Sequence, residues 1–148
     1  MIRLKDGIII TALNIEYLHQ IYKLGLEEPV FKDLLNPWTV DNIASVISSD
    51  LFTAFIARRK NKVLGFIIGE NKGADAEILW LTVQPHLRKK GIGSALIESF
   101  IKISNSTGIS KIFIRLLENN LETINFFSKK GLIVKNTFTE LIYDKSIN

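Results

Sequence analysis

The chain has 148 residues, enough for one domain with a full hydrophobic core and too few for two ordinary domains. Apolar residues make up 47% of the chain and charged residues 23%, so burial can offset the entropy of ordering and a disordered protein is excluded. The net charge is +4, from 19 basic and 15 acidic side chains.

The absence of cysteine excludes several kinds of chemistry. Without it there are no disulfides, thiolate nucleophiles, cysteine-ligated zinc sites or iron–sulfur clusters. His19 and His86 are the only histidines, so we expect no metal site. No apolar run approaches the roughly 20 residues that a membrane helix needs, and residues 1–6 lack a signal-peptide core. The sequence therefore predicts a cytoplasmic protein with no membrane partner.

The positive charge lies in the second half of the chain. Residues 1–76 hold nine basic and nine acidic side chains, whereas residues 77–148 hold ten and six. This imbalance suits an anionic ligand, although ordinary solubilising charge explains it equally well. The basic run at residues 58–62 has no interleaved aromatic residues and no recognition motif, so no nucleic-acid partner is expected.

The first half of the chain predicts a strand, two helices and three further strands. β-branched residues 8–11 predict a short strand, and apolar residues at helical spacing then predict a helix that Gly25 ends. A second helix begins after Thr39, which can accept a hydrogen bond as its N-cap. Residues 52–57 and 63–68 predict an antiparallel pair joined by a polar turn, and residues 76–83 predict the next strand.

The second half predicts alternating helices and strands. A helix begins near Ile92 and ends at Gly108, residues 111–117 form a strand, and a second helix runs from Asn120 to Lys130. Residues 141–143 predict a last strand. The order β-α-α-β-β-β-α-β-α-β, with no linker or repeat, predicts one α/β domain over residues 1–148.

The segment between the strand at 76–83 and the next helix predicts an anion site. Gly91 and Gly93 allow the backbone to approach a phosphate closely, and the first helical N–H groups point at it. Basic side chains at residues 88–90 add charge, although a tight helix entry with solvated lysines gives the same pattern. Leu96 stands where a Rossmann fingerprint needs a third glycine, and no Gly-Lys-Ser/Thr of a P-loop is present.

Two motifs resemble those of the GNAT superfamily of N-acetyltransferases. Residues 88–93, Arg-Lys-Lys-Gly-Ile-Gly, match the acyl-CoA signature Arg/Gln-x-x-Gly-x-Gly/Ala. Residues 120–132 match a second signature, an asparagine followed by an aromatic-containing helix that closes with glycine. The resemblance implies a central mixed, mostly antiparallel sheet with flanking helices. It also implies a splayed parallel pair, formed by the strands at 77–83 and 111–117, that holds acetyl-CoA.

The resemblance also implies which residues contact the acyl-CoA. The backbone of the strand before the motif would follow the pantetheine, amides of the motif would surround the pyrophosphate, and Asn120 would reach the pantetheine or serve as a plain helix cap. The implied cofactor-binding residues are Leu81, Thr82, Val83, Arg88, Lys89, Lys90, Gly91, Ile92, Gly93, Ser94, Asn120 and Phe127.

Acetyl transfer to an amine requires a base, because a lysine-like amine is mostly protonated at neutral pH. Glu77 lies 14 residues before Gly91, the offset of the general-base glutamate in the histone acetyltransferase branch. By alternation it shares a face with Leu79 and Leu81, as a partly buried base or as a strand-end glutamate in water.

The protonation of the CoA thiolate departs from the family pattern. Many relatives place a tyrosine where this chain has Phe127, and a phenyl ring cannot donate a proton. Tyr143 and Ser128 are candidate substitutes. Arg115 is a second departure, since branches that acetylate protein N-termini often have a glutamate five residues before the asparagine.

The resemblance implies an acyl-CoA-dependent N-acetyltransferase. Acetyl would pass from acetyl-CoA to a primary amine of a small molecule or a protein by direct attack in a ternary complex. Residues 26–31 could present carboxylates to a cationic acceptor, although loop acids are commonly just solvated. The alternative is an acyl-CoA-binding sensor with weak catalysis. The sequence leaves the acceptor, the acyl preference and homodimer formation open.

Overall fold

The computed structural model describes residues 2–28, 31, 37–116 and 121–136, and within them the chain forms one seven-stranded sheet. The strands lie in chain order: β1 (Ile2–Arg3), β2 (Ile8–Ala12), β3 (Phe52–Arg59), β4 (Lys62–Lys72), β5 (Asp75–Val83), β6 (Lys111–Leu116) and β7 (Ile133–Asn136). Strands β1 to β5 are antiparallel, and β6 is parallel to both β5 and β7. The predicted mixed, mostly antiparallel sheet is confirmed.

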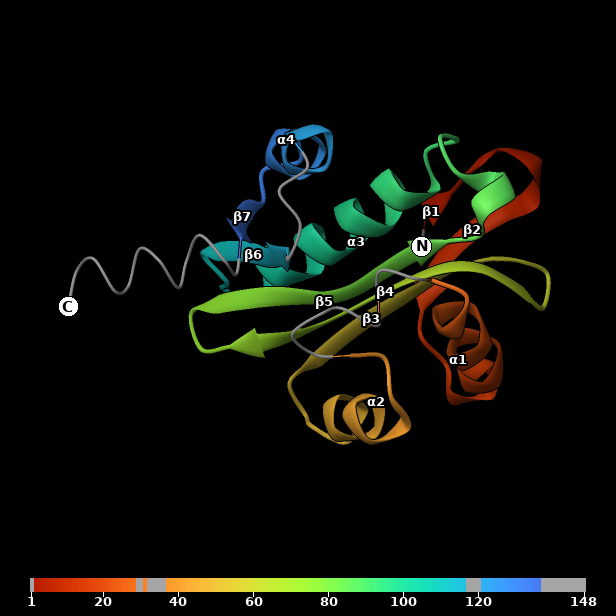
Figure 1. The fold of residues 1–148 in the computed structure, drawn as a ribbon, viewed down its shortest axis with the longest axis horizontal. Helices are drawn as coiled ribbons and strands as arrows, with labels where there is room; N and C mark the ends of the chain where they lie inside the picture. Colours follow the sequence, from red (N-terminus) through yellow and green to blue (C-terminus); the bar gives the residue numbers. More distant parts are fainter. Residues whose placement is uncertain (1, 29–30, 32–36, 117–120, 137–148) are drawn as a thin grey trace.

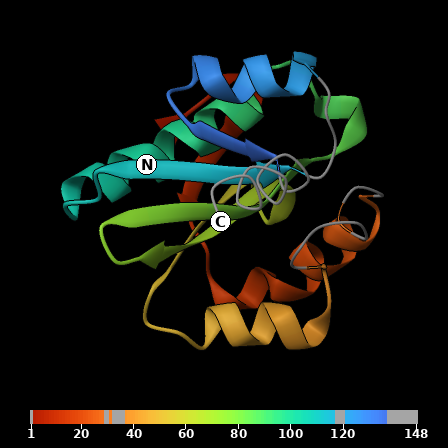
Figure 2. The same ribbon diagram turned by 60° about the vertical axis from the view of Figure 1, so that its left-hand side comes forward.

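Helices cover both faces of the sheet. They are α1 (Leu18–Leu26), α2 (Val40–Ile47), α3 (Ile92–Ser106) and α4 (Leu121–Lys129). Helices α1 and α2 lie on one face, and α3 and α4 lie on the other (Figures 1 and 2). Successive β4 side chains pack into separate cores. Phe66 and Ile68 lie in the core on the α1 side of the sheet, whereas Ile67 lies in the core on the α3 side. This alternation explains why β4 reads as a continuous apolar run.

An aromatic cluster fills the core on the α1 side. The Trp38 ring stacks on Phe66 with 5.1 Å between centroids and meets Trp80 edge-on, also at 5.1 Å. The Trp38 indole N–H donates to the carbonyl of Tyr22 at 3.0 Å. Both tryptophans are buried, so they serve in packing.

Gly25 does not end the first helix, contrary to the sequence prediction, because α1 continues to Leu26. A β-carbon at Gly25 would collide with the Trp38 indole. This glycine therefore permits close packing of the α1 backbone against the aromatic cluster rather than a left-handed helix cap.

A bulge interrupts the pairing of β4 with β5. Ile68 pairs with Trp80 and Gly69 pairs with Ile78, which leaves Leu79 as an extra residue. Leu79 and Trp80 therefore both pack into the core on the α1 side, whereas Leu81 packs against the opposite core. The prediction that Glu77, Leu79 and Leu81 share one face is wrong for Leu81, because the extra residue reverses the alternation.

The parallel pair of β5 and β6 separates where the bulge begins. Its register runs from Asp75 opposite Lys111 to Ile78 opposite Ile114 and goes no further. The last residues of both strands therefore diverge, which confirms the predicted splayed pair.

The far edge of the sheet differs from the prediction. Strand β7 over Ile133–Asn136 was not expected, because only Ile133 and Val134 are β-branched and the stretch is short. The two-residue β1 was missed for the same reason of length. The last strand predicted at residues 141–143 lies outside the described residues.

Candidate active site

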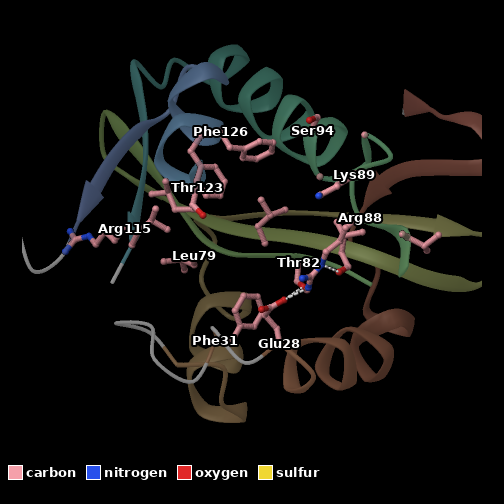
Figure 3. Close-up of a pocket in the computed structure, with 18 residues that line it drawn as sticks. Glu28, Phe31, Leu79, Thr82, Arg88, Lys89, Ser94, Arg115, Thr123 and Phe126 are labelled. Carbon is pink, nitrogen blue, oxygen red and sulfur yellow. Dashed lines mark hydrogen bonds and ion pairs between the residues drawn. The ribbon is translucent and has the colours of Figure 1, made fainter. Parts of the chain in front are cut away.

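A cavity of about 330 Å³ occupies the space between the diverging strands. The β5 residues that line it are Leu79, Leu81, Thr82 and Val83, and the β6 residues are Ile114, Arg115 and Leu116. The loop and first turn after β5 close one end, α4 forms a wall, and the segment after α1 contributes Glu28 and Phe31 (Figure 3). The volume and the mostly apolar lining are typical of a small-molecule site.

The loop after β5 presents backbone groups to one end of the cavity. A short 3-10 helix over Pro85–Leu87 is followed by left-handed backbone at Lys89 (φ 63°) and Gly91 (φ 86°). Helix α3 then begins at Ile92, and no side chain caps its first N–H groups. Such an uncapped start, with the positive end of the helix dipole, fits an anion.

The predicted motif residues divide between the cavity and the rest of the molecule. Arg88, Lys89, Gly91, Gly93 and Ser94 line the cavity. The side chain of Lys90 is exposed and lies outside the lining. Ile92 is 1% exposed and packs into the α3 core, and it does not line the cavity.

Arg88 is held by protein groups. Its Nε donates to the Val83 carbonyl at 3.0 Å, and its Nη2 donates to Glu28 Oε2 at 2.6 Å. The Thr82 hydroxyl donates to the same carboxylate oxygen at 2.9 Å. Figure 3 shows these contacts at the end of the cavity opposite Arg115. The expectation that Arg88 simply adds charge for a phosphate is therefore incomplete, since Glu28 offsets that charge.

Glu77 is buried in an ionic cluster and does not line the cavity. Its side chain is 4% exposed, with Lys72 Nζ at 3.1 Å from one carboxylate oxygen and Arg115 Nε at 3.1 Å from the other. The Arg115 Nε–H makes no aligned hydrogen bond, so its contact with Glu77 is ionic. The Glu77 side chain lies on the same face of the sheet as Leu79, and Leu79 lines the cavity.

The cluster shifts the titration of Lys72. Burial lowers the pKa of Lys72, but its hydrogen bond to Glu77 and the negative charges of Glu77 and Glu70 raise it. The net result is a pKa above the ordinary 10.5.

One face of α4 forms the cavity wall. Thr123, Phe126 and Phe127 line the cavity at helical spacing, and the two rings lie 5.2 Å apart at 73°. Ser128 is exposed and lies outside the lining. Asn120 and Tyr143, predicted for cofactor contact and proton donation, lie outside the described residues.

Several lining residues were not singled out from the sequence. Thr123 could have been found because it lies four residues before Phe127 on the same helical face, and Phe126 lies three residues after Thr123. Glu28 was considered only as part of an acidic segment, and 60 residues separate it from its partner Arg88. Leu79 was missed because the bulge is not visible in the hydrophobic pattern.

The family model for the acetyltransferase (GNAT) family matches residues 15–132. This match covers most of the chain, and the chain therefore belongs to the GNAT family.

Solved structures share the fold at low identity. The ribosomal-protein-S18-alanine N-acetyltransferase from Escherichia coli is 21% identical over 84% of this chain and 76% of its own, with a TM-score of 0.72. The PaiA N-acetyltransferase from Thermoplasma acidophilum, in complex with coenzyme A, is 21% identical over 82% and 87%, with a TM-score of 0.69. Ard1 from Thermoplasma volcanium is 22% identical over 84% and 82%, also with a TM-score of 0.69. These similarities establish the fold alone.

The described residues include neither a membrane-spanning helix nor a metal-binding cluster. None of the helices among them has the length and apolar character to cross a bilayer. No cluster of three or more histidine or acidic side chains in the same part of the chain is arranged to hold a metal ion.

Proposed function

We propose that the protein is an acyl-CoA-dependent N-acetyltransferase that transfers acetyl from acetyl-CoA to a primary amine of a small molecule or a protein. The observation that carries this proposal is a cavity that runs from the splay of β5 and β6 to the uncapped start of α3. A cavity that joins an apolar channel to an anion site fits a ligand with an uncharged arm and a diphosphate.

The loop and the end of β5 would bind the cofactor. Gly91, Gly93 and Ser94 line the end of the cavity where their amides would bind phosphate, and Lys89 would add a positive charge there. Leu81, Thr82 and Val83 line the part of the cavity where their backbone would follow the pantetheine. Phe127 supplies apolar surface opposite these strands, and we keep Asn120 as a predicted contact.

The reaction would proceed by direct attack in a ternary complex. The amine nitrogen forms a bond to the thioester carbonyl carbon, the C–S bond breaks, and the thiolate of CoA leaves. Backbone amides at the bulge around Leu79 are candidates to polarise the carbonyl oxygen. The fixed cavity supplies the orientation that makes this attack effective.

Glu77 is the proposed general base. Because Glu77 does not line the cavity, a water molecule would carry the proton from the amine to its carboxylate. Phe127 cannot protonate the leaving thiolate, so solvent or one of the predicted substitutes, Tyr143 or Ser128, would do so.

An acyl-CoA sensor is the second candidate function. Two observations favour it: Phe127 stands at the position of the usual tyrosine, and Glu77 forms ion pairs with Lys72 and Arg115 outside the cavity. A sensor would bind acyl-CoA at the same loop without efficient turnover.

We also propose that residues 1–148 form a single domain and that the protein is cytoplasmic.

Calorimetry followed by a turnover assay tests the function. We expect the purified chain to bind acetyl-CoA, and we expect free CoA thiol to appear when a panel of primary amines is added. Binding without release across diamines, amino acids and peptides would favour the sensor. No heat with any CoA species would reject both candidates.

A further inference from the structure

We propose that Glu28 is a positioning residue for acyl-CoA binding, acting through Arg88 to hold the loop of residues 84–91 in its binding shape. This proposal rests on the proposed function. It is independent of which amine accepts the acetyl group.

Three separate segments meet at the Glu28 carboxylate. Its Oε2 accepts from Arg88 Nη2 at 2.6 Å and from the Thr82 hydroxyl at 2.9 Å. Arg88 Nε in turn donates to the carbonyl of Val83 at 3.0 Å. The carboxylate therefore joins the segment after α1, the end of β5 and the anion loop in one hydrogen-bonded group.

The carboxylate at the centre of these contacts is largely buried, whereas its arginine partner is half exposed. The Glu28 side chain is 12% exposed, although the Arg88 side chain is 49% exposed. A charge-assisted hydrogen bond between a largely buried carboxylate and a guanidinium is stronger than an open surface pair. Because Thr82 is 5% exposed and fixed in β5, the carboxylate has little freedom to follow Arg88 elsewhere.

The adjacent loop needs such support. Lys89, directly after Arg88, has a left-handed backbone with φ 63°, a conformation that L-residues with side chains rarely adopt. Restraining Arg88 from both Glu28 and Val83 fixes the start of this turn. The amides beyond it are then aligned before a phosphate arrives, which reduces the entropy lost on binding.

Charge repulsion alone predicts that CoA binds more tightly when the Glu28 carboxylate is removed. A carboxylate beside a site for a polyanion repels it, so removal of the charge would strengthen binding. The positioning role predicts weaker binding on removal. The sign of the change in affinity therefore separates the two explanations.

The test compares Glu28→Gln with Glu27→Gln, which removes the same charge from an exposed neighbouring side chain. Loss of one charge-assisted hydrogen bond is expected to raise the Kd for CoA by about tenfold in Glu28→Gln. We expect Glu27→Gln to bind as the wild type does, or slightly more tightly. Unchanged or tighter binding by Glu28→Gln, measured by calorimetry, would overturn the proposal.

A double-mutant cycle checks that Arg88 transmits the effect. In an Arg88→Met background, Glu28→Gln should cause no further loss of affinity, since the partner is already absent. An equal loss in both backgrounds would show that Glu28 acts independently of Arg88 and would overturn the proposal.

Hydrogen exchange in the free protein separates this proposal from the proposed function. We expect faster exchange of the amides of residues 84–91 in Glu28→Gln and no change in Glu27→Gln. If the wild type binds no CoA, the proposed function fails, and this measurement still decides whether Glu28 orders the loop. Equal exchange in wild type and Glu28→Gln would then overturn the positioning role.

Discussion

Glu77 combines a proposed catalytic role with ion pairs to Lys72 and Arg115. If its carboxylate receives the amine proton, Glu77→Gln removes general-base catalysis and should lower kcat by about 100-fold. Steady-state kinetics with acetyl-CoA and a working amine measures this effect.

Lys72→Met provides the control for the ion pair. It removes one cation from Glu77 and leaves the carboxylate and Arg115 in place. We expect Lys72→Met to lower the midpoint of thermal unfolding and to retain most of kcat. An equal loss of kcat in both variants would mean that Glu77→Gln lowers kcat by disturbing the fold rather than by removing a general base.

Gly91 is required because the turn has a left-handed backbone there, not because a larger side chain would collide with its neighbours. Its φ is 86°, and an added β-carbon would meet nothing within 4 Å. In Gly91→Ala, a backbone penalty of about 1–2 kcal/mol would destabilise and distort the turn, and acetyl-CoA affinity would fall about tenfold. Calorimetric titration measures that loss.

Gly73→Ala is the matched control for Gly91→Ala. Gly73 has φ 87°, equally open surroundings and a place in the β4–β5 turn away from the cavity. Both variants should lose similar stability, and only Gly91→Ala should lose affinity. Parallel losses of affinity would remove Gly91 from the binding site.

Single residues were predicted well where the signal was local. The loop glycines and Lys89 were identified from a contiguous motif, because turn geometry and helix-start charge depend on neighbours in sequence. The Arg88–Glu28 pair was not, because pairing across 60 residues depends on how α1 packs beside β5. Glu77 was found, but its two cationic partners come from β4 and β6.

At the scale of elements, Gly69 controls the bulge that starts the splay. A β-carbon there would collide with the Glu77 carbonyl oxygen and lie 2.6 Å from the Phe100 ring. Gly69→Ala should therefore lower the free energy of unfolding by about 1–3 kcal/mol, the usual cost of overpacking. Urea denaturation measures the change.

Gly93→Ala gives the comparison for Gly69→Ala. Its added β-carbon would come no closer than 3.9 Å to Val83 Cγ2, and alanine favours the helix. We expect no loss of stability in Gly93→Ala. A loss as large as that of Gly69→Ala would mean that steric crowding at the bulge is not the cause.

Periodicity located most elements but not their irregularities. Strands β3 to β6 and helix α3 were predicted within a few residues, because apolar spacing reports which face is buried. The continuation of α1 through Gly25 depends on Trp38, and the bulge at Leu79 depends on Gly69 and Phe100. These close approaches are tertiary contacts, so the pattern of one segment cannot reveal them.

For the whole molecule, the raised pKa of Lys72 predicts a loss of stability at alkaline pH. A pKa above 10.5 in the folded state means that the charged ammonium stabilises the fold fully below about pH 10.5. That contribution is lost as the pH rises through the folded pKa. The stability difference between wild type and Lys72→Met should therefore shrink above pH 10.5, as measured by urea denaturation.

Lys62→Met is the control for alkaline stability. Lys62 is an exposed residue at the start of β4, and none of the ion pairs among the described residues includes it. Its variant should follow the wild-type stability at every pH. The assigned ion pair would be contradicted if the difference in unfolding free energy between wild type and Lys72→Met stayed unchanged at high pH.

The order of helices and strands predicted one α/β domain, and the mixed sheet with its splayed parallel pair followed from the resemblance to the GNAT superfamily. The pairing of β6 with β7 was not predicted, since β7 has four residues and weak β propensity.

The aromatic cluster gives the protein an internal optical probe. Its two tryptophans lie in one core with Phe31 and Leu79, which also form part of the cavity wall. A molecule that enters the cavity changes the surroundings of this core, and indole emission responds to small changes in packing and polarity. Intrinsic fluorescence can therefore report ligand entry without any attached dye.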